Sequence, residues 1–435
     1  MHINWDFLVY SMTTIGAVMI AFVLLMSVYY LTFWSVSAWP FELAPHSTKL
    51  TKFAVLVAAR NESNVIEHLL VSLKQQTYPR LSYEAYFIVE SEDDPTIEIV
   101  KRYGFKYFVR DRLAPDRRTK GFALQECIDY LKRNNMLYDA YMIFDADNIL
   151  DPDYLEVMND LRQTGVKVGL GYRNFTNANS NWLTIGSSIM FSYMNEVTNK
   201  GRSYLFHKAT LMGTGYYIDR DIIDDIGGWI FTGMTEDIQL SSFCYYHDVY
   251  MRYYPMTCFY DEQATDYKTM HNQHLRWLAG YFQRRQFLKK VGVQYDYHPK
   301  NLLRFMNFEY RTGLFPFAIF NVVMILSGII NMIFGILGYV YHVDVYYCNY
   351  LLIMMAFDFL LVYLSFVLPA MITIIRDNKR MNLTWKNRII GMLTYFFYFM
   401  DFALAFLDGL FHPSKKTNWK RVEHTGEVTN KGITK

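Results

Sequence analysis

The chain has 435 residues, of which 52% are hydrophobic and 18% aromatic, and its formal net charge is +2. This length predicts two or three units of domain size, and the near-neutral charge without a basic tract argues against a nucleic-acid partner. The cysteines are scattered without Cys-x-x-Cys spacing, which argues against a structural zinc site or a disulfide framework and fits a reducing cytoplasm. They are Cys127, Cys244, Cys258 and Cys348.

The first predicted element is an apolar helix. Residues 7–41 contain no Asp, Glu, Lys or Arg, which is enough to span a bilayer. Residues 1–7 carry Asp6 but no Lys or Arg, so the basic head of a signal peptide is missing, and the apolar run is too long for one. We therefore predict a retained transmembrane helix in 7–34 and a first region, 1–49, made of this helix and a linker.

Residues 50–277 have mixed polarity and predict a soluble domain. Apolar runs at 53–59, 86–89, 107–109 and 140–144 are typical of buried strands, and helical spacing separates them at 65–73, 95–103 and 119–131. This alternation predicts an α/β fold with a mostly parallel, Rossmann-like sheet. After residue 150 the pattern is weaker: we expect a strand at 166–171, a polar loop at 174–181, a helix at 182–195 and a turn at 213–215.

The strand at 140–144 is followed by two carboxylates, Asp145 and Asp147. In an extended chain, side chains two residues apart point the same way, and ligands bind at the carboxyl end of such strands. Two hard oxygen ligands there suit Mg²⁺ or Mn²⁺ carrying a diphosphate. The alternative is a solvated turn after a strand.

Two further motifs stand at expected helix starts. Lys120-Gly121 opens the helix at 119–131, where a lysine beside unpaired backbone N–H groups can hold phosphate. Thr235-Glu236-Asp237 precedes another helix. Its alternative interpretation is a Thr235 N-cap followed by acidic first-turn residues, which helices favour without any catalytic role.

The last motif is Gln273-x-x-Arg276-Trp277, on a helix that leads toward the membrane; the alternative is an amphipathic interfacial helix with an aromatic anchor. In this order the motifs resemble the processive family 2 glycosyltransferases of membranes, which include cellulose, hyaluronan, chitin and poly-N-acetylglucosamine synthases. The resemblance covers about 53–277 and the flanking membrane segments. It implies a GT-A catalytic fold, a UDP-sugar donor, a divalent cation (Mg²⁺ or Mn²⁺) and inversion at the anomeric carbon.

The resemblance also implies a role for each matching residue. Asp237 is expected as the general base, and Asp147 and Asp145 as metal ligands, Asp147 the more direct. Glu62 and Glu90 are expected at the nucleoside, and Lys120, Gln273 and Arg276 at the diphosphate, while Asp145 is expected to bind the donor through the cation. The residues expected at the acceptor are Gly213, Thr214, Glu236 and Trp277. The chain departs from the family at Glu90 and Ser91, where an Asp pair is usual.

Three apolar segments, 312–343, 349–375 and 389–411, follow the soluble block. We predict interfacial amphipathic helices in 278–311, channel-forming transmembrane helices in 312–411 and a basic tail in 412–435. The basic loops 283–311 and 376–388 predict a cytoplasmic catalytic domain. Four crossings would leave the basic tail outside, so either one segment is a hairpin or re-entrant, or the tail breaks the charge rule.

Aspartates inside these apolar segments are expensive and usually face a polar interior. Asp358, Asp401 and Asp408 are the residues concerned. They are expected either to line a polymer channel or, for Asp401, to pair with another helix while Asp408 reaches the interface.

The sequence therefore predicts an inverting, processive polysaccharide synthase of the plasma membrane that elongates a β-linked glycan from a UDP-sugar, with UDP-glucose favoured. One alternative is a non-processive transferase with a lipid acceptor, or a synthase of an N-acetylglucosamine or hyaluronan-type polymer. Another is a membrane transport or scaffold protein that retains a nucleotide-binding fold.

Overall fold

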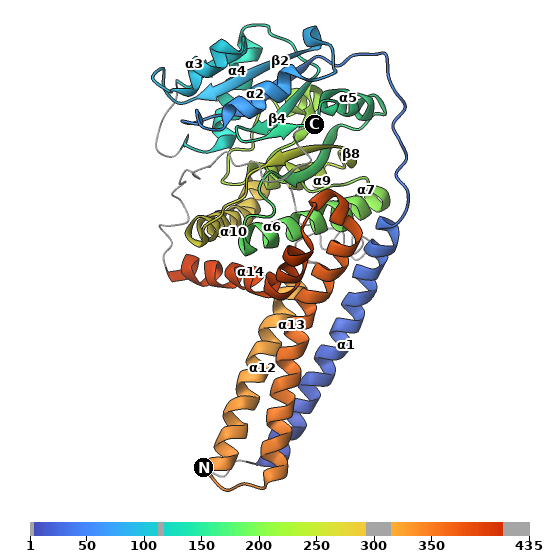
Figure 1. The fold of residues 1–435 in the computed structure, drawn as a ribbon, viewed down its shortest axis with the longest axis vertical. Helices are drawn as coiled ribbons and strands as arrows, with labels where there is room; N and C mark the ends of the chain where they lie inside the picture. Colours follow the sequence, from blue (N-terminus) through green and yellow to red (C-terminus); the bar gives the residue numbers. More distant parts are fainter. Residues whose placement is uncertain (1–3, 112–116, 293–314, 412–435) are drawn as a thin grey trace. The chain divides into compact units, whose positions relative to one another are not determined.

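The structure is a computed structural model that describes residues 4–111, 117–292 and 315–411. The chain forms two compact units (Figure 1). One contains Met1–Ala38 and Tyr295–Ile372, and the other contains Trp39–Gln294 and Thr373–Lys435. We call the second the catalytic unit, because it holds the sheet and all the expected catalytic residues.

The first unit consists of long apolar helices. They are α1 (Trp5–Ser37), α12 (Phe315–Val340) and most of α13 (Val345–Met381). The helices α12, α13 and α14 (Trp385–Phe411) contain spans long and apolar enough to cross a membrane. Asp358 on α13 is buried and accepts a hydrogen bond from Asn331 of α12 at 3.0 Å. This aspartate therefore lies between two packed helices, which is how polar groups are usually accommodated in apolar helices.

An eight-stranded sheet with the order β3-β2-β1-β4-β7-β6-β8-β5 forms the core of the catalytic unit. Its first half is parallel and is the part that apolar runs predicted: β1 (Phe53–Ala58), β2 (Tyr83–Val89), β3 (Lys106–Val109) and β4 (Ala140–Asp145). The crossover helices are α2 (Ile66–Lys74), α3 (Thr96–Arg102) and α4 (Lys120–Arg133). A 3₁₀ turn, Arg80–Ser82, precedes β2. The prediction of an α/β fold with a mostly parallel, Rossmann-like sheet is confirmed.

The second half of the sheet is mixed. It contains β5 (Ile149–Leu150), β6 (Val168–Phe175), β7 (Tyr216–Asp219) and β8 (Met251–Asp261). β7 is antiparallel to both β4 and β6, whereas β6 and β8 are parallel. The sequence did not reveal β8. The loop predicted from residue 174 was wrong at its start, because β6 includes Asn174 and Phe175 and is buried along its whole length.

The remaining helices cover this second half. They are α5 (Tyr154–Gln163), α6 (Trp182–Tyr193), a π-helical turn Met194–Asn199, α7 (Lys200–Phe206), α8 (Arg220–Asp225), α9 (Glu236–Tyr246) and α10 (Tyr267–Lys290). Figure 1 shows α6, α10 and α14 together below the sheet, and α14 contacts both of the others. α10 continues past the boundary expected at 277. Of the predicted interfacial region and tail, 293–311 and 412–435 lie outside the described residues.

Candidate active site

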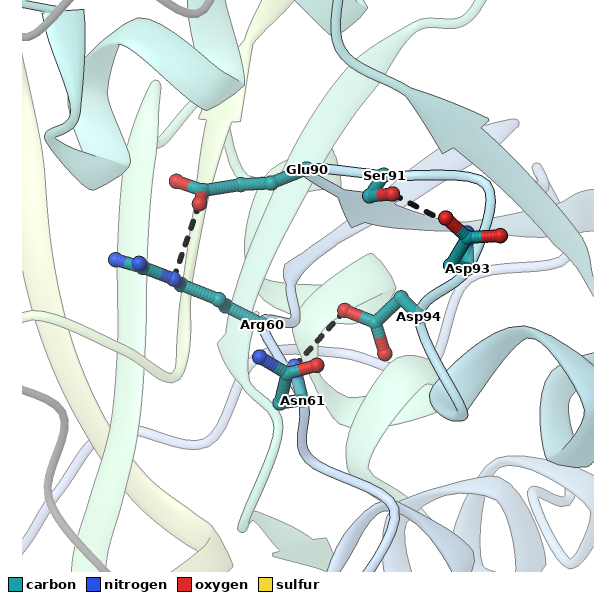
Figure 2. A pocket seen from close by; sticks show the side chains of 6 residues that line it. All are labelled: Arg60, Asn61, Glu90, Ser91, Asp93 and Asp94. Carbon is teal, nitrogen blue, oxygen red and sulfur yellow. Dashed lines mark hydrogen bonds and ion pairs between the residues drawn. The ribbon is translucent and has the colours of Figure 1, made fainter.

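The site begins where the parallel strands end. β1 lies between β2 and β4, and Ala58 at its end pairs with Ile88 on one side and Asp145 on the other. Side chains that follow these strands therefore meet at one edge of the sheet, the usual ligand position in such folds. A cavity of about 210 Å³ opens there (Figure 2). Its lining residues are Arg60, Asn61, Glu90, Ser91, Asp93 and Asp94.

Charged pairs shape this cavity. Glu90 accepts from Arg60 Nε at 3.0 Å and lies 3.7 Å from a terminal nitrogen of Arg110. The Asn61 backbone N–H donates to Asp94 Oδ2 at 2.9 Å. The structure thus places Glu90 in the cavity wall. Glu62 is buried beside the cavity, and its backbone N–H donates to the Thr96 hydroxyl at 3.0 Å.

Lys120 reaches the neighbouring strand end from the start of α4. Thr119 caps this helix by accepting from the Phe122 N–H at 3.3 Å, and its hydroxyl donates to the Thr232 carbonyl at 2.9 Å. A Cβ atom on Gly121 would lie 2.2 Å from the Phe231 carbonyl oxygen. Only glycine therefore allows the start of α4 to pack against the loop that leads to Thr235.

The Lys120 ammonium connects three segments of the site. It donates to Asp145 Oδ1 at 2.5 Å and to the Gly213 carbonyl at 2.8 Å, and it lies 3.9 Å from Glu236. Burial disfavours its charge, but Asp145 and Glu236 outweigh burial and raise the pKa of Lys120. The lysine expected at the diphosphate thus already neutralises part of an acidic cluster.

The two carboxylates of the Asp-x-Asp motif lie differently from the expectation. β4 ends at Asp145, and Asp147 is in the turn that follows, so strand alternation does not orient the pair. The Asp145 backbone N–H donates to the Thr214 hydroxyl at 2.9 Å. Asp147 Oδ2 accepts from the Glu262 backbone N–H at 3.1 Å. Tertiary hydrogen bonds therefore hold the motif.

The donor set fits a divalent cation that takes its other ligands from substrate. Asp145 and Asp147 are both partly exposed, and the described residues contain no group of three His, Cys, Asp or Glu side chains placed to hold a metal. Mg²⁺ and similar ions are usually bound by one or two carboxylates, with phosphate and water completing the shell. Two carboxylates at an open edge match that arrangement.

A buried ion pair that the sequence did not reveal lies within the electrostatic reach of Asp145 and Asp147. Arg173 of β6 donates to Asp261 of β8 through Nε at 3.0 Å and to the Met212 carbonyl at 2.6 Å. Burial raises the pKa of Asp261 to about 6 despite Arg173, and Asp147 adds to the rise. No local pattern marks this pair, because its members come from strands far apart in the chain.

Glu236 and Asp237 start α9 beside Lys120. Thr235 stands at the N-cap position with two acidic residues in the first turn, but its side chain makes no capping hydrogen bond among the described residues. Instead it packs on α10, where a Cβ atom on Gly280 would lie 2.1 Å from Thr235 Oγ1. Burial raises the pKa of Glu236 to about 8 and also raises the pKa of Asp237.

α10 brings the last motif to the same cluster. Burial lowers the pKa of Arg276, while Glu236, Asp145 and Asp237 oppose that shift, so the guanidinium lies within the electrostatic reach of all three carboxylates. Gln273 lies one helical turn earlier and is partly buried.

Trp277 is partly buried where α6, α10 and α14 meet. Its ring centroid lies 6.0 Å from that of Phe191, 5.2 Å from that of His274 and 6.3 Å from that of Phe402. The structure therefore brings together Lys120, Asp145, Gly213, Glu236, Asp237 and Arg276, whereas Trp277 lies in an aromatic layer beside them.

Comparison with known proteins shows the family of the chain. The family model described as "Glycosyltransferase like family 2" matches residues 51–280, more than half of the chain, and the chain belongs to this family. It is therefore a glycosyltransferase, which excludes the alternative of a transport or scaffold protein.

Two curated relatives and one solved structure show how far the similarity extends. The probable glycosyltransferase YdaM of Bacillus subtilis is 26% identical over 383 residues, covering 86% of this chain and 85% of the relative. The beta-monoglucosyldiacylglycerol synthase of Trichormus variabilis is 28% identical over 241 residues, 53% of this chain and 49% of the relative. The mannosyltransferase PcManGT from Pyrobaculum calidifontis, solved with GDP-Man and Mn²⁺, has a TM-score of 0.55 at 15% identity, covering 92% of this chain and 99% of that one. This last similarity concerns the fold alone.

Proposed function

We propose that the enzyme transfers glucose from UDP-glucose to the end of a growing β-linked glycan, with inversion, at the cytoplasmic face of the plasma membrane. The observation that supports this most is the convergence of Lys120, Asp145, Asp237 and Arg276 at one strand end, next to the cavity that holds Glu90. A site for transfer needs this combination of donor pocket, cationic groups and one base.

In the proposed reaction, an acceptor hydroxyl attacks the anomeric carbon from the face opposite the diphosphate. Asp237 takes the hydroxyl proton while the bond between the anomeric carbon and the diphosphate oxygen breaks, and UDP leaves. Burial raises the pKa of Asp237 above its usual 3.8, which makes it a better proton acceptor than an exposed aspartate. One displacement without a carboxylate nucleophile inverts the configuration.

The leaving diphosphate needs positive charge. Asp147 and Asp145 would hold the divalent cation, which supplies Lewis-acid stabilisation of that diphosphate. Lys120 keeps Asp145 oriented through its 2.5 Å hydrogen bond. Arg276 offers a planar guanidinium that suits two phosphate oxygens at once.

Two acceptors are considered for this transfer, a growing glycan and a lipid. The Gln273-x-x-Arg276-Trp277 motif favours a growing glycan, because the processive synthases carry it. A lipid acceptor is the second candidate, because the relative from Trichormus variabilis is named a beta-monoglucosyldiacylglycerol synthase.

A product assay tests both. The full chain in lipid nanodiscs is incubated with Mn²⁺ and, separately, radiolabelled UDP-glucose, UDP-N-acetylglucosamine and UDP-glucuronate, with and without diacylglycerol. We expect a long product, digestible by β-glucanase, from UDP-glucose without added lipid. A short, organic-soluble product that requires diacylglycerol would establish the second candidate. Transfer from another sugar alone would overturn the choice of donor.

A further inference from the structure

Helix α14 is apolar enough to cross a membrane and yet packs against the catalytic unit. It contains an apolar span, Trp385–Gly409, long enough to cross a membrane. It also belongs to the catalytic unit, where it contacts α6 and α10 (Figure 1). Whether such a helix crosses the bilayer depends on how much of its length is held by that unit.

The start of α14 is attached through polar contacts. The Asn179 side chain accepts from the Thr384 backbone N–H at 3.1 Å and from the Asn387 amide at 2.9 Å. Just before this link, the end of α13 is held in the same unit, because Arg380 donates to Glu196 at 2.9 Å and Ser192 donates to Asp377 at 2.5 Å.

Close packing holds the first half of α14 against α6. A Cβ atom on Gly186 would lie 2.6 Å from the ring of Tyr398, and one on Gly391 would lie 2.7 Å from Ile189. A glycine on each helix therefore allows the two axes to approach closely. Neither glycine has a positive φ, so the close approach of the helices, and not the backbone conformation, accounts for a glycine at these two positions.

A cluster of two histidines and two aspartates holds the second half of α14 against α10. Asp401 Oδ2 lies 2.6 Å from His274 Nδ1, and its Oδ1 lies 2.7 Å from His271 Nδ1. The other ring nitrogen of His271 lies 3.4 Å from Asp408. Asp401 is 1% exposed, so a polar side chain within the apolar span faces the catalytic unit.

These contacts extend from Gly391 to Asp408, about 26 Å along the helix axis at 1.5 Å per residue. This is close to the ~30 Å hydrocarbon thickness of a bilayer. A perpendicular α14 would take α10 into the hydrocarbon with it, together with Arg276 and Arg284. Charged side chains at that depth are strongly disfavoured.

The opposite face of α14 is apolar and exposed. Its members recur at helical spacing, and the exposed positions between 389 and 407 carry no charge. They are Ile389, Ile390, Leu393, Phe397, Ala403, Leu404, Phe406 and Leu407. Exposed Trp385 and Lys386 stand at the start of the helix, where interfacial helices carry aromatic and basic residues. The chain reaches this start directly from α13, a candidate membrane span.

We propose that α14 does not cross the membrane but lies in the bilayer surface on the side of the catalytic unit. Its exposed face enters the boundary between headgroups and acyl chains, and its Asp401 face binds α6 and α10. Of the four predicted crossings, those of α1, α12 and α13 then remain. Because α12 and α13 cross the membrane and return, the basic tail lies on the same side as the catalytic unit, in accord with the charge rule. In this arrangement Asp401 pairs with the histidines of α10 and does not line a polymer channel.

Depth measurements on the full chain test this orientation. Single nitroxide labels are placed at Ile390→Cys, Leu393→Cys, Phe397→Cys and Leu404→Cys, all exposed positions of α14, in nanodiscs. Labels at Leu326→Cys, Ile329→Cys, Ile333→Cys and Ile336→Cys give the matched α12 series. The native chain treated with the same nitroxide reagent gives the background signal from its own cysteines, three of which are buried. Power saturation with oxygen and a nickel chelate then reports the depth of each label.

We expect one shallow depth at all four α14 positions and a changing depth along α12. A depth that is greatest near Phe397 and decreases toward both ends of α14 would overturn the proposal. Aqueous exposure of all four labels would also overturn it, because the apolar face would then be covered by something other than lipid.

A topology experiment tests the consequence for the tail. An impermeant thiol reagent is applied to intact cells and to inverted vesicles carrying a cysteine added after Lys435. Leu81→Cys, 96% exposed in the catalytic unit, and Tyr346→Cys, 68% exposed at the start of α13, are the controls. We expect the added cysteine to label together with Leu81→Cys. Labelling together with Tyr346→Cys would contradict the proposal.

Discussion

The two sides of the active site are built by different means. On one side, the cavity lies at the ends of β1, β2 and β4. Glu90 follows β2 and Asp145 ends β4, so the position of each carboxylate follows from a buried apolar strand. On the other, α9 and α10 carry Asp237 and Arg276 and are held by a glycine contact between helices. The strand side is expected to bind the donor and the helix side to determine turnover.

The largest effect is expected on the helix side. Asp237→Asn removes the proposed base and should lower kcat about 10³-fold, within the usual range for general base loss, while UDP binding is preserved. Turnover and UDP titration are measured on the same preparation. Asp225→Asn, an exposed position on α8, is the control. Persistent turnover in Asp237→Asn would refute the assignment.

The next effect belongs to the strand side. Asp147→Asn should lower activity about 10²-fold by removing a carboxylate ligand of the cation. UDP-glucose affinity measured with Mn²⁺ should fall toward the affinity measured in EDTA, whereas the EDTA value stays as in the native chain. Equal losses with and without Mn²⁺ would contradict a role in metal binding.

Gly280→Ala tests whether helix packing determines turnover. The new methyl group would lie 2.1 Å from Thr235 Oγ1 and push α10 away from α9. We expect kcat to fall about tenfold to 100-fold, because small misplacements near the reacting groups are costly. Gly280→Ala combined with Thr235→Gly should recover part of the loss, since the two changes share one contact. A dominant KM effect would argue that both sides bind the donor.

Glu90→Gln should act on donor binding alone. The carboxylate lies in the cavity wall 3.0 Å from Arg60, and we expect KM for UDP-glucose to rise by about fivefold with kcat unchanged, consistent with one weakened, partly exposed polar contact. Glu98→Gln, an exposed change on α3, is the control. An unchanged KM would separate this cavity from the donor.

The smallest effect near neutral pH is expected for Glu236→Gln. Burial raises the pKa of Glu236 from 4.5 to about 8, so the native chain keeps a proton that the unfolded chain releases between these values. Stability therefore falls as pH rises through this window. Gln mimics the protonated form of Glu236, so the activity of the variant near pH 7 should stay within about threefold of that of the native chain. The fall in melting temperature between pH 5 and pH 9 should be smaller in the variant than in the native chain by about a few degrees. An unchanged pH slope would show that Glu236 is ionised in the native chain.

Prediction from sequence succeeded where a feature is local. The strands at 53–59 and 140–144 appear as β1 and β4, because a continuous apolar run marks a strand buried on both faces. It failed for β8, where Arg252, Pro255 and Thr257 interrupt the apolar and aromatic run, and a proline inside a run argues against a strand. It also could not show how the Thr235 side chain is used, because the residue stands at the N-cap position but packs against Gly280 of α10 instead of capping α9.

The first four strands with the helices between them, the presence of the Asp-x-Asp and Thr-Glu-Asp motifs and the length of the apolar helices can be predicted from the sequence, since each depends on residues close together in the chain. Tertiary structure alone decided that Arg173 meets Asp261 and that Asp401 of α14 meets His271 and His274. The pairing of a buried charge depends on which distant elements pack together. For that reason, hydropathy identifies α14 as long enough to cross a membrane, and its contacts place it on the catalytic unit.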